Sequence, residues 1–246
     1  MEIALLSILG VFVGFASGFF GIGGGAIVVT VLLYFGYDVK EAIGISVVQM
    51  VLSSLFGSYL NYKRGLFKLN QSVYVGIGGL IGGAFSGVVI ASVPAIALEV
   101  LLAIVLALGI LKAGLKKGFN DIEIKLSKGA LIVIGAAIGL VAISAGIGGG
   151  VLIGILFFGF FGYDIKKAVS MGLFFVVFAS ISGLISISLN VGVNWGAGVL
   201  LGIGALVGVF FGTKAQASVD RKLQKRINIA FNVIILSMLI KKIFLG

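Results

Sequence analysis

The sequence carries two copies of the pentapeptide Gly-Ile-Gly-Gly-Gly, at Gly21–Gly25 and Gly146–Gly150, inside nearly continuous hydrophobic sequence. Each glycine within a helix costs about 1 kcal/mol relative to alanine. In a bilayer, every backbone group that such a break frees must also find a new partner. Two equivalent and costly breaks therefore predict a membrane protein of two similar halves, with a solute site built from backbone near the middle of the membrane.

The composition agrees with a membrane protein. Hydrophobic residues make up 60% of the 246 residues and charged residues 11%, and the hydrophobic residues form long runs. The chain has no cysteine and no histidine, which removes thiol nucleophiles, disulfides and the usual zinc and haem ligands. We therefore expect an all-α polytopic membrane protein that is not an enzyme and has no catalytic residues, no metal site and no cofactor.

The net charge of +10 would indicate a nucleic-acid partner in a soluble protein. Here nearly all the basic residues lie in short segments between hydrophobic runs. Cytoplasmic loops of membrane proteins carry an excess of lysine and arginine, and this explains the charge without any nucleic acid. Membrane lipid is the expected partner besides the solute, and the sequence is also compatible with a homo-oligomer.

The two halves of the chain match over most of their length, at an offset of 125 residues at the glycine clusters and 126 from Gly36 onward. The matched segments are Tyr34–Ala42 with Phe160–Ala168, Gly76–Leu80 with Gly202–Leu206, and Ala91–Val93 with Ala217–Val219. Together with the glycine clusters, these make four matches in the same order, which indicates an internal duplication. We expect a first membrane repeat at residues 1–118, a short cytoplasmic linker at 119–126 and a second membrane repeat at 127–246.

The hydrophobic runs predict the membrane segments. In order, they are Ile3–Phe20, Gly24–Gly36, Ala42–Tyr62, Ser72–Val93, Ala95–Leu111, Gly129–Ser144, Gly150–Gly162, Ala168–Leu189, Trp195–Thr213 and Ile227–Ile240. Crossing a bilayer takes about 20 apolar residues, so the two runs that begin at the glycine clusters are too short. One unbroken helix from Ile3 to Gly36 would be about 50 Å long, against a bilayer core of about 30 Å. Each cluster must therefore kink or reverse the chain.

Loop charges distinguish a kink from a reversal. If the chain passes straight through both clusters, the two sides of the membrane receive ten and eight of the 18 lysines and arginines. If each cluster reverses the chain, one side receives fifteen and the other three. The positive-inside rule therefore favours reversal.

Reversal makes the two halves opposite in orientation. The loop Lys63–Lys68 is basic, whereas its counterpart Leu189–Asn194 is uncharged, as expected for equivalent loops on opposite sides. We predict an inverted-topology internal repeat with about eight full spans and two glycine-broken, re-entrant half-helices. Both termini are expected to be extracytoplasmic.

A half-helix that begins at a glycine cluster suits anion binding. The N-terminus of a helix presents unpaired N–H groups and about half a positive charge, and glycine lets a ligand approach them closely. Two such ends, converging in the membrane, could hold an anion without arginine or lysine. The alternative is that the glycines only permit close helix packing. The candidate binding glycines are Gly21, Gly23, Gly24, Gly25, Gly146, Gly148, Gly149 and Gly150.

Other polar residues inside the hydrophobic runs could line the same path. Ser17 and Ser144 lie near the breaks, and Gln49, Ser53, Ser54 and Ser180 lie in the middle of runs. Hydroxyl and amide groups donate hydrogen bonds to an oxyanion without adding charge. Such serines can instead bond back to their own helix. We select Ser17, Gln49, Ser54, Ser144 and Ser180 as candidate solute ligands.

These motifs resemble those of the TauE/SafE family of sulfite and organosulfonate exporters. The resemblance rests on the glycine pattern of Gly14–Gly25, on the following Gly36–Ala42, and on their recurrence at Gly146–Gly150 and Gly162–Ala168. It covers essentially the whole chain. It implies a multi-pass permease of the bacterial or archaeal inner membrane that handles sulfur-containing anions such as sulfite, sulfoacetate or thiosulfate. The family's glycine motif falls on the eight candidate glycines given above.

Taken together, the sequence predicts a transporter of small anions, by implication sulfite, sulfonates or thiosulfate, that works by alternating access with a site at the membrane midplane. The alternatives are a passive anion channel and, in another class, a membrane enzyme or assembly factor that handles lipid.

Overall fold

The computed structural model describes residues 2–66, 69–115, 126–159 and 161–245, and these residues form ten α-helices and no strand. The helices are α1 (Glu2–Phe20), α2 (Gly25–Tyr34), α3 (Val39–Lys63), α4 (Leu69–Ser92), α5 (Ala95–Leu115), α6 (Lys128–Ser144), α7 (Gly150–Gly159), α8 (Ile165–Asn190), α9 (Trp195–Ser218) and α10 (Arg221–Leu245). Every expected hydrophobic segment is found as a helix. The expected linker at 119–126 lies almost wholly outside the described residues.

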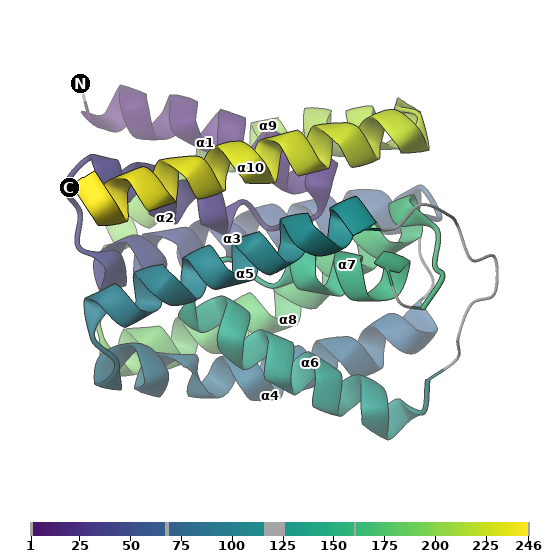
Figure 1. Ribbon diagram of the computed structural model, residues 1–246, viewed down its shortest axis with the longest axis horizontal. Coiled ribbons are helices and arrows are strands. Elements are labelled where there is room, and N and C mark those ends of the chain that lie inside the picture. The colour runs from purple at the N-terminus through teal and green to yellow at the C-terminus, as the bar shows by residue number, and fades with distance from the viewer. Residues whose placement is uncertain (1, 67–68, 116–125, 160, 246) are drawn as a thin grey trace.

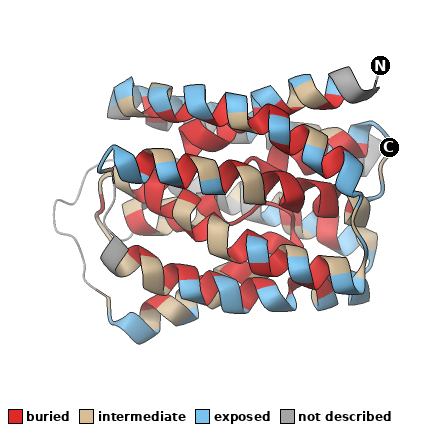
Figure 2. Cartoon of the chain, turned by 180° about the vertical axis from the view of Figure 1, so that it is seen from behind, coloured by how far each residue is buried: buried red, intermediate tan, exposed pale blue. Residues whose placement is uncertain are grey.

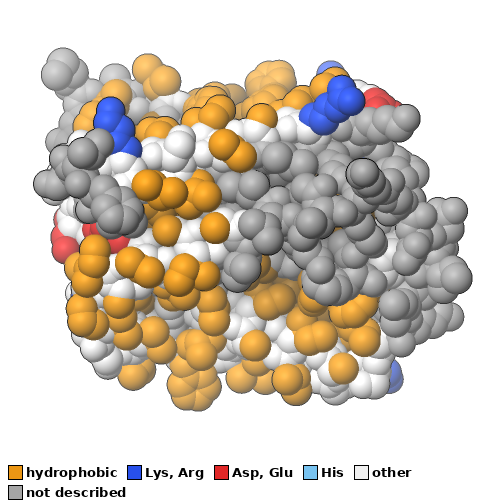
Figure 3. Space-filling model, viewed as in Figure 1, with side chains coloured by type: hydrophobic (Ala, Val, Ile, Leu, Met, Phe, Trp, Pro, Cys, Tyr) orange, Lys and Arg blue, Asp and Glu red, His pale blue; other side chains and the backbone are white. Residues whose placement is uncertain are grey.

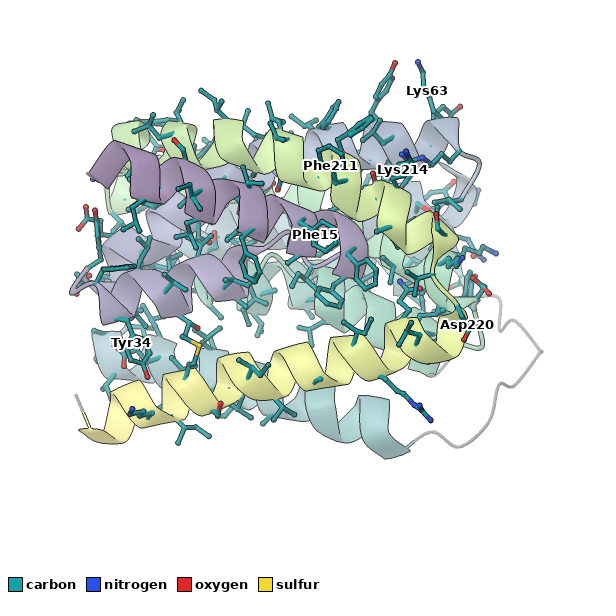
Figure 4. All side chains as sticks on the ribbon, turned by 90° about the horizontal axis from the view of Figure 1, so that it is seen from above. Phe15, Tyr34, Lys63, Phe211, Lys214 and Asp220 are labelled. Atoms are coloured by element: carbon teal, nitrogen blue, oxygen red, sulfur yellow. The ribbon has the colours of Figure 1, made fainter. Side chains whose placement is uncertain are left out.

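The helices lie side by side along one common direction, so the bundle has two ends (Figure 1). Helix α1 begins and α10 ends at the same end, and the chain passes from α5 to α6 at the other. Seen from above, Lys63 and Lys214 lie at the α5–α6 end, whereas Tyr34 lies at the end with the termini (Figure 4). We call these the basic end and the terminal end.

Two lysines at related positions fix the helix ends in the same way. The Nζ atom of Lys40 donates a hydrogen bond to the carbonyl oxygen of Ala91, at 3.2 Å, in the last turn of α4. The Nζ atom of Lys166 donates one to the carbonyl oxygen of Ala217, at 2.6 Å, in the last turn of α9. Both members of the second pair lie 126 residues after those of the first. A cation at a helix C-terminus also meets the negative end of the helix dipole.

The packing of the helices follows the repeat as well. Helix α1 packs along α9, and its counterpart α6 packs along α4. Helix α4 also packs on α8, as α9 does on α3, while α3 and α8 contact each other. Exchanging each helix for its counterpart in the other half turns the α1–α9 contact into the α6–α4 contact and the α3–α9 contact into the α8–α4 contact. The same exchange leaves the α3–α8 contact unchanged. The two halves therefore interlock and do not form separate bundles.

Glycines bring the paired helices together. A Cβ added at Gly14 of α1 would clash with the backbone of Ala205 in α9, and one added at Gly82 of α4 would clash with the backbone of Ala136 in α6. Both would come far closer than 3.0 Å, a separation below which real Cβ atoms are essentially never found. At these positions, close packing of neighbouring helices is enough to explain the glycines, because small residues allow membrane helices to approach closely.

The described helices agree with a multi-pass membrane protein. Four of them are long and apolar enough to cross a membrane: Val39–Lys63, Gln71–Ser92, Ile165–Asn190 and Trp195–Ser218. Several shorter apolar helices accompany them. Buried residues occupy the inward faces of the helices and exposed residues the outward faces (Figure 2). Hydrophobic side chains cover much of the described surface between the two ends (Figure 3), as a lipid-facing surface requires.

Candidate functional site

Each glycine cluster separates two helices, as the sequence predicts. Gly21–Gly25 connects α1 to α2, and Gly146–Gly150 connects α6 to α7. Tyr34, at the end of α2, lies at the terminal end where α1 begins, so the chain turns back at the first cluster (Figure 4). Three glycines in each cluster have a positive φ, which side chains of L-residues rarely allow. They are Gly21 (71°), Gly23 (76°), Gly24 (84°), Gly146 (69°), Gly148 (82°) and Gly149 (77°).

The two clusters touch through their backbones. A Cβ on Gly25 would clash with the carbonyl oxygen of Gly146, and a Cβ on Gly150 would clash with the carbonyl oxygen of Gly21. The two contacts are equivalent under the repeat. All ten residues of the clusters are buried. The breaks therefore meet in the interior of the bundle, where the sequence analysis expects a site.

The N-terminus of α2 has no side-chain cap. Its N-cap residue is Gly24, whose φ of 84° is left-handed, and no side chain accepts a hydrogen bond there. By contrast, a side-chain oxygen caps each of α3, α6, α8 and α9, from Asp38, Ser127, Asp164 and Asn194 respectively. The first N–H groups of a helix have no partner within it. The buried start of α2 is thus a place where backbone donors and the positive helix end are available to a ligand.

Gln49 of α3 lies at this uncapped end. Its Oε1 atom is 3.4 Å from the position that a Cβ on Gly24 would take. The side chain is 0% exposed, and neither of its amide atoms has a hydrogen-bond partner within the described part of the chain. An unsatisfied buried polar group costs about 1–3 kcal/mol. Among the side chains selected from the sequence, Gln49 is the one best placed to contact a ligand at this helix start.

Hydroxyl groups of α1 and α3 lie beside both clusters. The Oγ atom of Ser17 donates to that of Ser53 at 3.5 Å, and Ser53 Oγ donates to the carbonyl oxygen of Gly23 at 3.4 Å. Ser46 Oγ donates to the carbonyl oxygen of Gly146 at 3.0 Å. Ser46 is not among the residues selected from the sequence, where its one signal is its place one turn before Gln49 on the same face of α3.

The other selected serines differ in their bonding. Ser54 Oγ donates to the carbonyl oxygen of Val51, and Ser180 Oγ to that of Val177, both at 3.4 Å and both within their own helix. This is the back-bonded arrangement given above as the alternative. Ser144, the last residue of α6, is 1% exposed, and its hydroxyl has no hydrogen-bond partner among the described residues.

The second cluster has the same backbone as the first but apolar neighbours. A Cβ on Gly149 would lie 2.7 Å from Cε1 of Phe175 and 3.0 Å from Cβ of Ala142. Phe175 occupies the position related to Gln49, and Ala142 the position related to Ser17. The amide beside Gly24 is therefore replaced by apolar side chains beside the equivalent Gly149. Among the described residues, no three acidic, cysteine or histidine side chains lie together as metal ligands would.

Comparison with known proteins gives a consistent picture. The family model described as "Sulfite exporter TauE/SafE" matches residues 6–241. The probable membrane transporter protein MJ0441 of Methanocaldococcus jannaschii is 30% identical over 192 residues, which cover 74% of this chain and 71% of that protein. The probable membrane transporter protein YunE of Bacillus subtilis is 25% identical over 255 residues, covering 92% and 91%. No solved structure matches the chain.

Proposed function

Because this chain belongs to the sulfite exporter TauE/SafE family, a family of probable membrane transporters and not of enzymes, we propose that it carries a small oxyanion across the membrane through the paired glycine clusters. We call the two clusters together with Gln49 the glycine site. The solute class that the family description supports is sulfite and related sulfur-containing oxyanions.

The observation that carries this proposal is the uncapped start of α2 beside an unpartnered amide. The buried N–H groups at Gly24 and Gly25 and the Nε2 atom of Gln49 are all hydrogen-bond donors, which an oxyanion accepts. The carbonyl oxygens around them are already engaged in part, since Ser53 and Ser46 donate to Gly23 and Gly146. The backbone N–H groups and Gln49 Nε2 are therefore available as donors, and Gln49 Oε1 is the acceptor that also lacks a partner in the described chain.

The absence of a charged ligand from the described surroundings of Gly24 suits a carrier. A solute that is to be released must bind strongly enough to enter and weakly enough to leave. Neutral donors and a helix dipole satisfy both conditions, whereas a buried lysine or arginine would hold the anion and would itself be costly in the membrane.

For the membrane topology, we propose an inverted repeat of residues 1–118 and 127–246, with about eight full spans and two re-entrant half-helices, α2 and α7. The basic end is assigned to the cytoplasm by the positive-inside rule, which leaves both termini outside. The related lysine contacts at opposite ends of the bundle support this arrangement. Transport proceeds by alternating access, with helices α1, α3 and α9 rocking against α4, α6 and α8 about the contact of α3 with α8.

The test is flux of radiolabelled sulfite into proteoliposomes under an imposed membrane potential, with sulfate, thiosulfate and an organosulfonate as competitors. Saturable, potential-sensitive sulfite movement with competition is the expected result. Conductance steps in a planar bilayer would identify a passive channel instead. Protein that is folded and inserted but moves none of these anions would overturn the proposal.

A further inference from the structure

Buried polar side chains continue from the glycine site along α3 toward the basic end. Beyond Gln49, the helix carries Ser53, Ser58 and Asn61, which are 0%, 6% and 0% exposed. At about 100° per residue they turn through roughly half the circumference of α3 and do not lie on a single face. Asn61 lies 12 residues after Gln49, which is about 18 Å along a helix, and α3 ends two residues later at Lys63. The row therefore spans the distance between the glycine site and the basic surface.

Hydrogen bonds within the described chain do not account for Ser58 and Asn61. Both amide atoms of Asn61 and the hydroxyl of Ser58 have no hydrogen-bond partner in the part of the chain that the structure describes. Buried polar side chains in proteins are almost always hydrogen-bonded, to protein or to water. Unpartnered groups at both ends of the row, Gln49 and Asn61, indicate that something polar meets them from outside the chain.

Helix α9 extends the row. A Cβ on Gly57 would lie 2.5 Å from Leu173 of α8 and 3.0 Å from Cγ1 of Val209 of α9. Lys63 and Lys214, near the ends of α3 and α9, both lie at the basic end (Figure 4), so the two helices run in the same direction. One turn beyond the contact of Gly57 with Val209, they carry Asn61 and Thr213. The next residue of α9 in this direction with an unpartnered polar atom is Gln216, which is 0% exposed. Its Nε2 donates to the carbonyl oxygen of Lys166 at 3.3 Å, and its Oε1 has no partner among the described residues.

The repeat provides an internal comparison for this row. The positions related to Gln49, Ser53, Ser58 and Asn61 hold Phe175, Ala179, Leu184 and Ile187. The position related to Gln216 holds Ile90. Phe175, Ala179, Ile187 and Ile90 are all 0% exposed. The same fold thus packs apolar side chains at the related positions, between the glycine clusters and the terminal end. At these positions the fold accommodates apolar side chains as well as polar ones.

We propose that Gln49, Ser53, Ser58, Asn61 and Gln216 line the route by which the solute passes between the glycine site and the basic end, and that Asn61 is a second solute-binding residue on it. This inference rests on the proposed transport function. An uncharged amide both donates and accepts hydrogen bonds, so it suits a small oxyanion and also its singly protonated form. The apolar counterparts close the corresponding route toward the terminal end in this conformation.

Cysteine accessibility tests the route independently of transport. The chain has no cysteine, so a single introduced thiol is the only one present. Asn61→Cys and Ile187→Cys occupy related, fully buried positions. In lipid nanodiscs, a charged methanethiosulfonate reagent should modify Asn61→Cys at least tenfold faster than Ile187→Cys. Equal rates, or faster modification of Ile187→Cys, would overturn the proposed route.

Sulfite flux then tests the role of Asn61. Asn61→Ile installs the residue that the repeat itself uses, and Ile187→Val is the matched control. We expect Asn61→Ile to reduce flux at least tenfold without lowering the melting temperature, because no hydrogen bond within the described chain is lost. Wild-type flux in Asn61→Ile would overturn the role of Asn61 while leaving the transport function intact. Fast labelling of Asn61→Cys in a protein that moves no anion would instead support the route and overturn the transport function.

Discussion

The hydroxyl of Ser46, in the first half of the chain, donates a 3.0 Å hydrogen bond to the carbonyl oxygen of Gly146, in the second glycine cluster. The position related to Ser46 is Gly172, where a Cβ would lie 2.6 Å from the carbonyl oxygen of Gly150. Ser46 thus donates a hydrogen bond to the cluster of the other half, whereas the related Gly172 has no side chain that could return one to Gly21. The duplication preserves the backbone path while the side chains diverge.

Replacing Ser46 with alanine should weaken this crossing. The variant leaves the buried carbonyl of Gly146 without its side-chain donor, and a typical hydrogen bond contributes about 0.5–1.5 kcal/mol. We expect Ser46→Ala to lower the melting temperature in detergent by a few degrees. Ser218→Ala is the control, because the exposed hydroxyl of Ser218 bonds only to Lys214 of its own helix. An equal effect in both variants would contradict a specific role for Ser46.

Gln49→Leu should separate transport from stability. Removing a buried amide that has no partner in the described chain should leave the melting temperature unchanged or higher. Sulfite flux in proteoliposomes should fall at least tenfold, because the solute loses a donor beside the start of α2. Thr30→Val removes another buried, unpartnered polar group, further along α2, and should keep its flux. Normal flux in Gln49→Leu would exclude this side chain from the site.

The helices could be predicted from the sequence because burial in a membrane leaves long apolar runs. Their starts were placed less well where polar residues belong to the first turn. Helix α8 begins at Ile165 after the cap Asp164, three residues before the expected Ala168. Helix α10 begins at Arg221, six residues before the expected Ile227, because its charged first turns carry no hydrophobic signal.

The candidate site could be predicted only in part. A glycine cluster is visible directly in the sequence, and glycine is the residue that readily adopts the positive φ values found there. The contact between Ser46 and Gly146 joins residues 100 positions apart and depends on how α3 crosses the second cluster. Spacing within one helix cannot reveal such a contact. The alignment of Gln49 with Phe175 was visible in the sequence, but its meaning required the position of both side chains beside related glycines.

Alanine at Gly25 or Gly150 should prevent the two clusters from meeting. Each added Cβ would clash with a carbonyl oxygen of the other cluster. We expect both variants to lose sulfite flux and to melt at a lower temperature. Gly154→Ala, in α7, is the matched control: a Cβ there meets nothing within 4 Å, and alanine favours the helix by about 1 kcal/mol. Wild-type sulfite flux and melting temperature in Gly25→Ala and Gly150→Ala would contradict a role for this contact in transport or in stability.

Labelling from the two sides of the membrane tests the proposed reversal at the glycine clusters. Leu66 follows α3 at the basic end, and Val191 follows the related helix α8 at the terminal end. In intact cells, a membrane-impermeant maleimide should modify Val191→Cys and spare Leu66→Cys, and permeabilised cells should show modification of both. The native chain has no cysteine, so any signal comes from the introduced residue.

Modification of both variants from the same side would contradict the inverted repeat. The chain would then pass through Gly21–Gly25 and Gly146–Gly150 without turning back, and the starts of α2 and α7 would lose their proposed role as paired ends of half-helices. Modification of Leu66→Cys alone in intact cells would keep the inverted repeat and reverse its orientation, so that the solute route through Asn61 would open to the outside.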